Sequence, residues 1–156
     1  MRLTETSVCV PLCEPKDYGS LGVDFDSPKL VYMSGLAALI TFGAITGNSV
    51  LTVYNGATKG AKTTAIAFKY RFGGGDFKAA SADTLGAPTA VTSAGLTLTA
   101  ATFDHRMIAI EVDSDTIVDG QPWLTVSISS AATVLFVAAV GVGQARNAGS
   151  TMPSVL

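Results

Sequence analysis

The chain has 156 residues, of which 48% are hydrophobic and 14% are charged, and its formal net charge at pH 7 is −2. This length suits one domain with its own hydrophobic core, and the near-neutral charge argues against the strongly basic surface of a general nucleic-acid-binding domain. Charged residues make up about 25% of a typical soluble domain. We therefore expect other molecules, most simply copies of the same chain, to cover much of the folded surface.

The N-terminal residues 1–28 show no regular hydrophobic period and contain three prolines. This pattern predicts an extended N-terminal arm that is either disordered or laid across a neighbouring subunit. The segment lacks the apolar stretch of roughly 7–15 residues that a cleaved signal peptide needs. Cys9 and Cys13 are separated by only three residues, and the chain has one histidine, so two free thiols are favoured over a local disulfide or a zinc site.

The segment from Leu30 to Gly60 is almost entirely apolar, and its first charged residue is Lys59. A membrane-spanning helix needs about 20 consecutive apolar residues, whereas only 16 run from Leu30 to Ile45, and serine, threonine and glycine interrupt them. A glycine-asparagine turn at residues 47–48 is followed by β-branched and aromatic residues at 50–54. The segment therefore predicts two paired strands in the core of a soluble sandwich.

Four later stretches alternate apolar and polar residues with a period of two, as half-buried strands do. Their apolar faces comprise Ile66, Phe68, Tyr70 and Phe72; Leu96 and Leu98; Ile108, Ile110 and Val112; and Leu124, Val126 and Ile128. Residues 133–143 are apolar on both sides, which predicts a strand covered on both faces.

Helical signals are weak, because no window shows sustained helical spacing with caps and residues 76–86 have room for one short turn only. About eight strands separated by polar turns predict an all-β fold, a β-sandwich or jelly roll. We assign residues 1–28 to the arm, 29–143 to the sandwich domain and 144–156 to a C-terminal tail.

Charge is distributed unevenly along the chain. Basic residues concentrate between Lys59 and Lys78, and acidic residues concentrate between Asp104 and Asp119. Two strands with opposite outward charge can pair within a sheet or across a subunit contact. Two separate solvated faces are the simpler interpretation.

Catalytic and ligand-binding motifs are weak throughout. His105, flanked by Asp104 and Arg106, has no G-x-S-x-G or similar nucleophile motif to work with, so a surface histidine at a turn is favoured. Residues 113–120 (DSDTIVDG) begin like a calcium loop but lack its later glycine and glutamate. The stretches FGGGDF and KGAKTT do not match a phosphate-binding motif. We therefore predict no catalytic, cofactor-binding or metal-binding residues, and no enzyme activity.

Three stretches together resemble a known class of protein. They are GAITGNSVLTVYNG at 43–56, AATFDHRMIAIEVDSD at 100–115 and VAAVGVGQARNAGSTMPSVL at 137–156. Over residues 23–156 the alanine-, threonine- and glycine-rich all-β chain is similar to the small virion proteins of tailed bacteriophages, and most similar to head decoration (capsid cement) proteins.

The resemblance implies a structural virion protein that binds the outside of an assembled phage capsid and stabilises it by bridging neighbouring subunits. Its implied partners are the major capsid protein lattice and copies of itself, as a dimer or trimer, with no nucleic acid, membrane or cofactor. Its implied location is the capsid surface of the virion, after synthesis in the host cytoplasm. Two alternatives remain open: another phage structural β-protein, from the tail or the head–tail connector, or a small β-barrel module that binds an apolar ligand.

Overall fold

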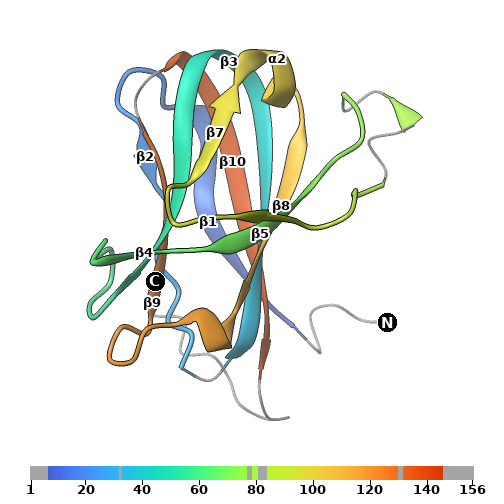
Figure 1. Cartoon of the computed structure of the whole chain (residues 1–156). Helices are drawn as coiled ribbons and strands as arrows, with labels where there is room; N and C mark the ends of the chain where they lie inside the picture. The colour runs from blue at the N-terminus through green and yellow to red at the C-terminus, as the bar shows by residue number, and fades with distance from the viewer. Residues whose placement is uncertain (1–6, 32, 77–78, 81–83, 130–131, 146–156) are drawn as a thin grey trace.

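The computed structural model describes residues 7–31, 33–76, 79–80, 84–129 and 132–145. Within these ranges the chain forms ten β-strands, joined by antiparallel pairing into one network, and one four-residue helix. The strands form two layers that face each other across a hydrophobic core (Figure 1). The predicted all-β sandwich is therefore confirmed.

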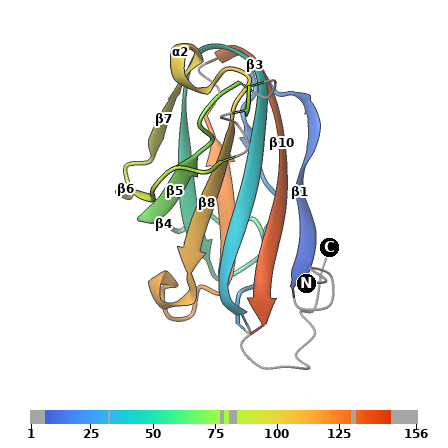
Figure 2. The ribbon, with the colours of Figure 1, turned by 90° about the vertical axis from the view of Figure 1, so that its right-hand side faces the viewer.

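The first layer, sheet A, has six strands, and Figure 2 shows four of them, β1, β10, β3 and β8, side by side. Its full order is β1 (Val8–Asp17), β10 (Ala132–Ala145), β3 (Met33–Gly56), β8 (Met107–Asp113), β5 (Phe68–Phe72) and β6 (Thr89–Val91). The helix α2 (Ala100–Phe103) precedes β8, and the 3-10 turn η2 (Ser114–Thr116) follows it.

The second layer, sheet B, is built around the later half of β3. This half pairs with β9 on one side and with β7 and β4 on the other, and β2 pairs with the far side of β9. The bounds of these strands are β2 (Val23–Asp24), β4 (Thr64–Ile66), β7 (Leu96–Thr99) and β9 (Trp123–Ile128).

Strand β3 belongs to both layers. In Figure 1 it runs up one layer, bends over the top of the sandwich and comes down in the other. Gly47, which has a positive φ of 85°, lies at this bend, where glycine allows a backbone conformation that most residues avoid. The predicted pairing of the two halves with each other is wrong, because each half pairs within a different sheet.

The strand predicted around residues 66–72 also divides between the layers. Ile66 in β4 pairs with Val53 in sheet B, whereas Phe68 begins β5, which pairs with β8 in sheet A. Like strand β3, the β4–β5 segment thus passes directly from one layer into the other.

The core lies between the sheets and matches the predicted apolar faces. Ile108, Ile110 and Val112 of β8 face Leu124, Val126 and Ile128 of β9 within one buried cluster. At the upper end Phe103 contacts Phe42 and Phe72 edge-on, with ring centroids 6.1 and 5.3 Å apart, an arrangement that aromatic rings favour. Residues from both layers are fully buried, including Ile40, Phe42, Leu51 and Leu98.

Residues 8–17, placed in the N-terminal arm by sequence, form the edge strand β1 in the structure. They pair with β10, and Val10 and Leu12 are buried in the core. Pro11 is tolerated because an edge strand has one row of backbone groups that needs no partner. Residues 1–6 of the predicted arm and 146–156 of the predicted tail lie outside the described residues.

The apolar segment that raised the membrane question forms strand β3. Among the described residues, no helix is long and apolar enough to cross a membrane.

Candidate functional site

His105 occupies the turn between α2 and β8. Its φ is 51°, its side chain is 52% exposed, and its Nε2 atom lies 3.9 Å from Oδ2 of Asp104. The other carboxylate oxygen of Asp104 accepts a hydrogen bond of 2.8 Å from the backbone N–H of Ile45. Asp104 therefore fixes the bend of β3, and His105 lies at a surface turn, as expected.

The other sequence motifs form turns and a loop. The DSDTIVDG stretch begins with the last residue of β8 and contains η2, and the glycines of FGGGDF follow β5. In the part of the chain that the structure describes, no three His, Cys, Asp or Glu side chains are grouped closely enough to hold a metal ion. Cys9 and Cys13 are free thiols, and burial raises the pKa of the Cys13 thiol.

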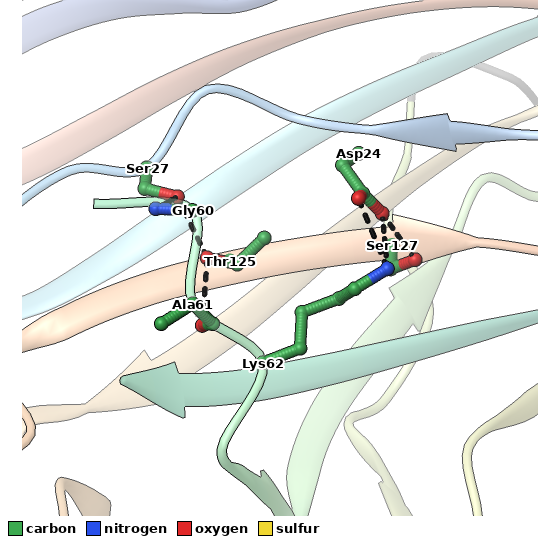
Figure 3. Close-up of polar contacts among 7 residues, drawn as sticks. All are labelled: Asp24, Ser27, Gly60, Ala61, Lys62, Thr125 and Ser127. Carbon is green, nitrogen blue, oxygen red and sulfur yellow. Dashed lines mark hydrogen bonds and ion pairs between the residues drawn. The ribbon is translucent and has the colours of Figure 1, made fainter. Parts of the chain in front are cut away.

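The KGAKTT stretch is part of a loop at residues 57–63, and a chain of hydrogen bonds fastens this loop to sheet B (Figure 3). Gly60 N–H donates to Ser27 Oγ at 3.1 Å, and the Thr125 hydroxyl donates to the Ala61 carbonyl at 3.4 Å. Between them Ser27 Oγ and Thr125 Oγ1 are 2.6 Å apart. Since the Thr125 proton is already used, Ser27 is the donor in this central bond. Each hydroxyl thus donates once and accepts once.

A second contact of the same loop involves Asp24 and is drawn in the same view (Figure 3). Asp24 accepts hydrogen bonds from Ser127 at 2.6 Å and from Lys62 at 3.0 Å. Burial opposes ionisation of Asp24, but these two hydrogen bonds and the Lys62 charge outweigh it and lower the pKa of the carboxyl group. Both contacts of the loop are structural, because every group in them is occupied by another part of the same chain.

The basic and acidic segments meet in sheet A. Strand β5 pairs with β8, which places Lys69 directly opposite Glu111, and Arg71 Nε donates to Glu111 Oε1 at 2.8 Å. The alternative in which strands of opposite charge pair within a sheet therefore holds at this position, and the simpler interpretation of two separate solvated faces does not.

A contiguous apolar surface lies on the side of sheet A that faces away from the core. Residues directly opposite each other in neighbouring strands point to the same side of a sheet. Val140 of β10 lies opposite Leu39 of β3 and Pro11 of β1, and Leu39 lies opposite Ala109 of β8. The same pairing defines the uncharged part of this surface, called the outer face below: Cys9, Pro11, Ala37, Leu39, Thr41, Met107, Ala109, Phe136, Ala138, Val140 and Val142. Lys69, Arg71 and Glu111 lie on the same side of sheet A and border it.

The outer face is uncharged along its two central strands. No charged residue occurs in β3 or in β10. Phe136 is 42% exposed and Val140 is 45% exposed. The prediction that residues 133–143 are covered on both faces is therefore wrong for the single chain, because only the face with Leu135, Val137 and Ala139 is buried.

One end of the outer face is hollowed. A shallow depression of about 550 Å³ is lined by Gly35, Ala37 and Val142, with Lys69, Glu111 and Asp113 among its charged residues. The depression forms where the small residues of β3 lie between Val142 and Gln144 of β10 on one side and the longer side chains of β8 and β5 on the other. It joins an apolar floor to a rim that carries both signs of charge.

Sequence reasoning foresaw an apolar surface that must meet other molecules, but it named none of these residues. The usable signal was the absence of charge from both β3 and β10 together with apolar side chains at both alternating positions of β10. Comparison of the chain with models of known protein families, with curated proteins and with solved structures found no match.

Proposed function

We propose that this protein is a structural virion protein of a tailed bacteriophage that binds the outside of the assembled capsid and stabilises it by bridging neighbouring subunits. Its partners in this proposal are the major capsid protein lattice and copies of itself, and it acts without a catalytic residue or cofactor. Its place is the capsid surface of the virion, after synthesis in the host cytoplasm.

The observation that carries the proposal is the outer face of sheet A. Monomeric soluble proteins rarely expose contiguous apolar patches larger than a few hundred Å². Here Phe136 and Val140 are each more than 40% exposed on a face whose central strands carry no charge. Burying such a face releases roughly 25 cal/mol per Å² of apolar area, which favours a protein that works in contact with other protein molecules.

The construction of the sandwich suits a bridging role. Strand β3 runs through both layers, and the β4–β5 segment also crosses directly between them. A load on one layer is therefore carried into the other through the backbone. A protein that binds only the assembled lattice stabilises that lattice by its binding free energy, and many copies multiply the effect.

The apolar-ligand alternative needs an interior cavity, and the space between the sheets is occupied by side chains. Ile40, Phe42, Leu51 and Ile108 each have 0% exposure. The hollow at Ala37 lies on the surface and is open to solvent. The core thus favours a packed structural domain over a carrier.

The proposal is tested on the phage whose genome encodes this chain. We expect the protein to co-sediment with purified heads, to be removable and re-addable without loss of the shell, and to raise the temperature at which heads release DNA. Its recovery only in tail or connector fractions would support the other phage alternative. Its absence from purified virions would reject the proposal.

A further inference from the structure

We infer that the outer face of sheet A is a two-fold interface between two copies of this chain, in which Phe136 of each copy fills the hollow at Ala37 of the other. The inference deepens the proposed function by naming the molecule that this face binds first. It rests on that function only for its biological setting, because the dimer needs no capsid to form.

Phe136 is one of two large apolar side chains that are strongly exposed on the outer face, the other being Val140. Its ring lies over Gly43 of the neighbouring strand, where a Cβ atom added to the glycine would come within 3.1 Å of the phenylalanine side chain. Glycine at position 43 therefore lets Phe136 lie across β3. The side chain remains 42% exposed, although phenylalanine is a residue that proteins usually bury.

The hollow is the complementary part, and it lies at the opposite end of the same strands. Its floor consists of Gly35, Ala37 and Val142, whose small or short side chains leave room above the sheet. Ala37 lies opposite both Val142 and Glu111. A bulky apolar side chain entering here meets an apolar floor and leaves the charged rim in solvent.

The positions of Phe136 and the hollow are compatible with a two-fold axis. Leu39 and Val140, which pair with each other, lie between them. Phe136 is four residues from Val140 along β10, roughly 13 Å, and Gly35 is the same number of residues from Leu39 in the opposite direction. A two-fold axis that crosses the strands at Leu39 and Val140 therefore brings each Phe136 over the other copy's hollow. Such an interface is isologous and closes on itself as a dimer.

The charges of the face permit this packing. The apolar strip on β10 and β3 brings no charged group into the centre, and the rim carries Lys69 and Arg71 beside Glu111 and Asp113. Because both signs occur side by side, no cluster of like charge is forced together when two faces meet.

The β1 edge of sheet A is a poorer place for self-association. Strand β1 carries Pro11 and Pro15, which donate no hydrogen bond to a neighbouring strand, and its last residues are charged. Proline and charge on an edge strand disfavour pairing with another chain. The outer face is therefore favoured over the β1 edge beside it as the surface that binds a second copy.

The size of the face sets the expected affinity. From Phe136 to Gln144 the face is roughly 27 Å long, and from β1 to β5 it is roughly 24 Å wide, or roughly 600 Å² in all. Stable interfaces bury about 800 Å² per partner, and those near 600 Å² belong to the weaker class. We therefore expect a dimer that dissociates at micromolar concentration.

The test uses sedimentation of the full-length chain at concentrations from about 1 to 200 µM, the range that brackets a micromolar dimer. We expect the wild type to dimerise in this range. Phe136→Ala, which removes the exposed ring, and Ala37→Phe, which fills the hollow, should each weaken dimerisation at least ~10-fold. Leu21→Ala, which shortens an apolar side chain that is 88% exposed outside sheet A, is the matched control and should dimerise like the wild type.

Mixing the two single variants gives the decisive result. In a dimer of one Phe136→Ala chain and one Ala37→Phe chain, Phe136 of the second chain meets the unchanged hollow of the first, as in the wild type. At the other contact, the bulky side chain introduced by Ala37→Phe meets the small side chain left by Phe136→Ala. Equal amounts of two monomeric variants should therefore form a mixed dimer with near wild-type affinity. Circular dichroism and melting of each variant confirm that the chains are folded before mixing.

The outcomes of these experiments separate the interface from the capsid function. A monomeric wild type up to 200 µM, wild-type dimerisation by Phe136→Ala, or a mixture that stays monomeric would each overturn the inference. A wild type that remains monomeric but needs Phe136 to bind capsids would assign the face to the shell and leave the proposed function standing. Dimerisation with the expected variant pattern but no binding to capsids would support the interface and reject the capsid function.

Discussion

The outer faces of sheets A and B are built from the same two-residue alternation, but the described residues of the chain cover only that of sheet B. On sheet B the outward residues Thr125 and Ser127 bind the loop at residues 57–63 and strand β2. On sheet A the outward residues Leu39 and Val140 lie in an apolar strip that the described parts of the chain leave open. The outward groups of sheet B thus bind other parts of the same chain, whereas the outer face of sheet A is a surface suited to contact with another molecule.

This contrast separates the residues that stabilise the fold from those that are available for association. The hydroxyl groups of Thr125 and Ser127 and the Asp24 carboxylate, on the outer side of sheet B, have partners within the chain, so changes there should act on folding. Apolar groups on the outer face of sheet A have few neighbours to lose, so changes there should act on association and solubility. Four substitutions or conditions test this division, in order of decreasing effect.

The largest difference in unfolding free energy is expected between substitutions on the two faces of sheet A. Ile110 has 0% exposure and Val140 has 45%. Ile110→Asp buries a carboxylate among apolar side chains and should cost about 4 kcal/mol or more of unfolding free energy. Val140→Asp should change that free energy by about 1 kcal/mol at most, because its carboxylate remains in water. Urea unfolding followed by circular dichroism measures both, and equal losses would mean that the outer face is misassigned.

The next effect concerns the hydrogen-bonded loop on sheet B. Thr125→Val keeps the shape of the side chain but leaves Ser27 without its acceptor and the Ala61 carbonyl without its donor. We expect a loss of about 1–3 kcal/mol. Thr97→Val, on the exposed side of β7, is the control and should stay within about 0.5 kcal/mol of the wild type. A wild-type unfolding free energy for Thr125→Val would show that the hydrogen-bond chain contributes nothing.

A pH dependence of stability should follow from Asp17 and Asp24. Backbone N–H groups of Leu135 and Gly19 lower the pKa of Asp17, and the contacts described above lower that of Asp24. Folding therefore favours the ionised carboxylates, and this stabilisation is present above the usual aspartate pKa of about 3.9. It is lost as the pH falls through the lower folded-state values.

Thermal melting between pH 6 and pH 2 measures this loss. Asp24→Asn should be less stable than the wild type at pH 6, and its melting temperature should fall less steeply below pH 4, because one linked group is missing. Ser127→Ala should give a smaller change in the same direction. If the melting temperature of Asp24→Asn falls with pH as steeply as that of the wild type, Asp24 does not contribute to the loss of stability in acid.

The smallest effect is expected at Ser49, an inward-facing residue of β3 in sheet B. It has 0% exposure, and its hydroxyl has no hydrogen-bond partner within the described chain. Ser49→Ala removes a buried polar group that is already unsatisfied, so it should be neutral or stabilise the fold by up to about 1 kcal/mol. A clear loss of stability, measured as for Thr125→Val, would mean that the hydroxyl has a bound water or another partner.

Much of the fold could be predicted from residue order alone. The strands around Ile110 and Val126 were recognisable because a period of two places their apolar side chains on one side whatever the strand pairs with. Pairing between the basic and acidic segments was one of the interpretations left open, because opposite charges were concentrated in two separate strands, but the individual pair of Arg71 and Glu111 was not predicted.

The outer face was harder to predict, since its residues are ordinary strand formers. In β10 both alternating sets are apolar, so composition gave no means of choosing which set is buried. Its partner strands decided this: Val137 and Ala139 face the core, while Phe136 and Val140 remain exposed. The hollow at Ala37 depends on side chains from β3, β8, β5 and β10, which are separated along the chain and meet only in the folded sheet.

Local alternation and composition are sufficient to specify the all-β class, the inward-facing side chains of most strands and the low density of surface charge. Long-range strand pairing sets the bend of β3 at Gly47 from one sheet into the other, the place of residues 8–17 at the edge of sheet A, and the exposure of Val140. Those outcomes depend on which strands meet over long sequence separations. Local preferences do not encode that choice, because an apolar strand fits an edge, a centre or an outer face equally well until its neighbours are in place.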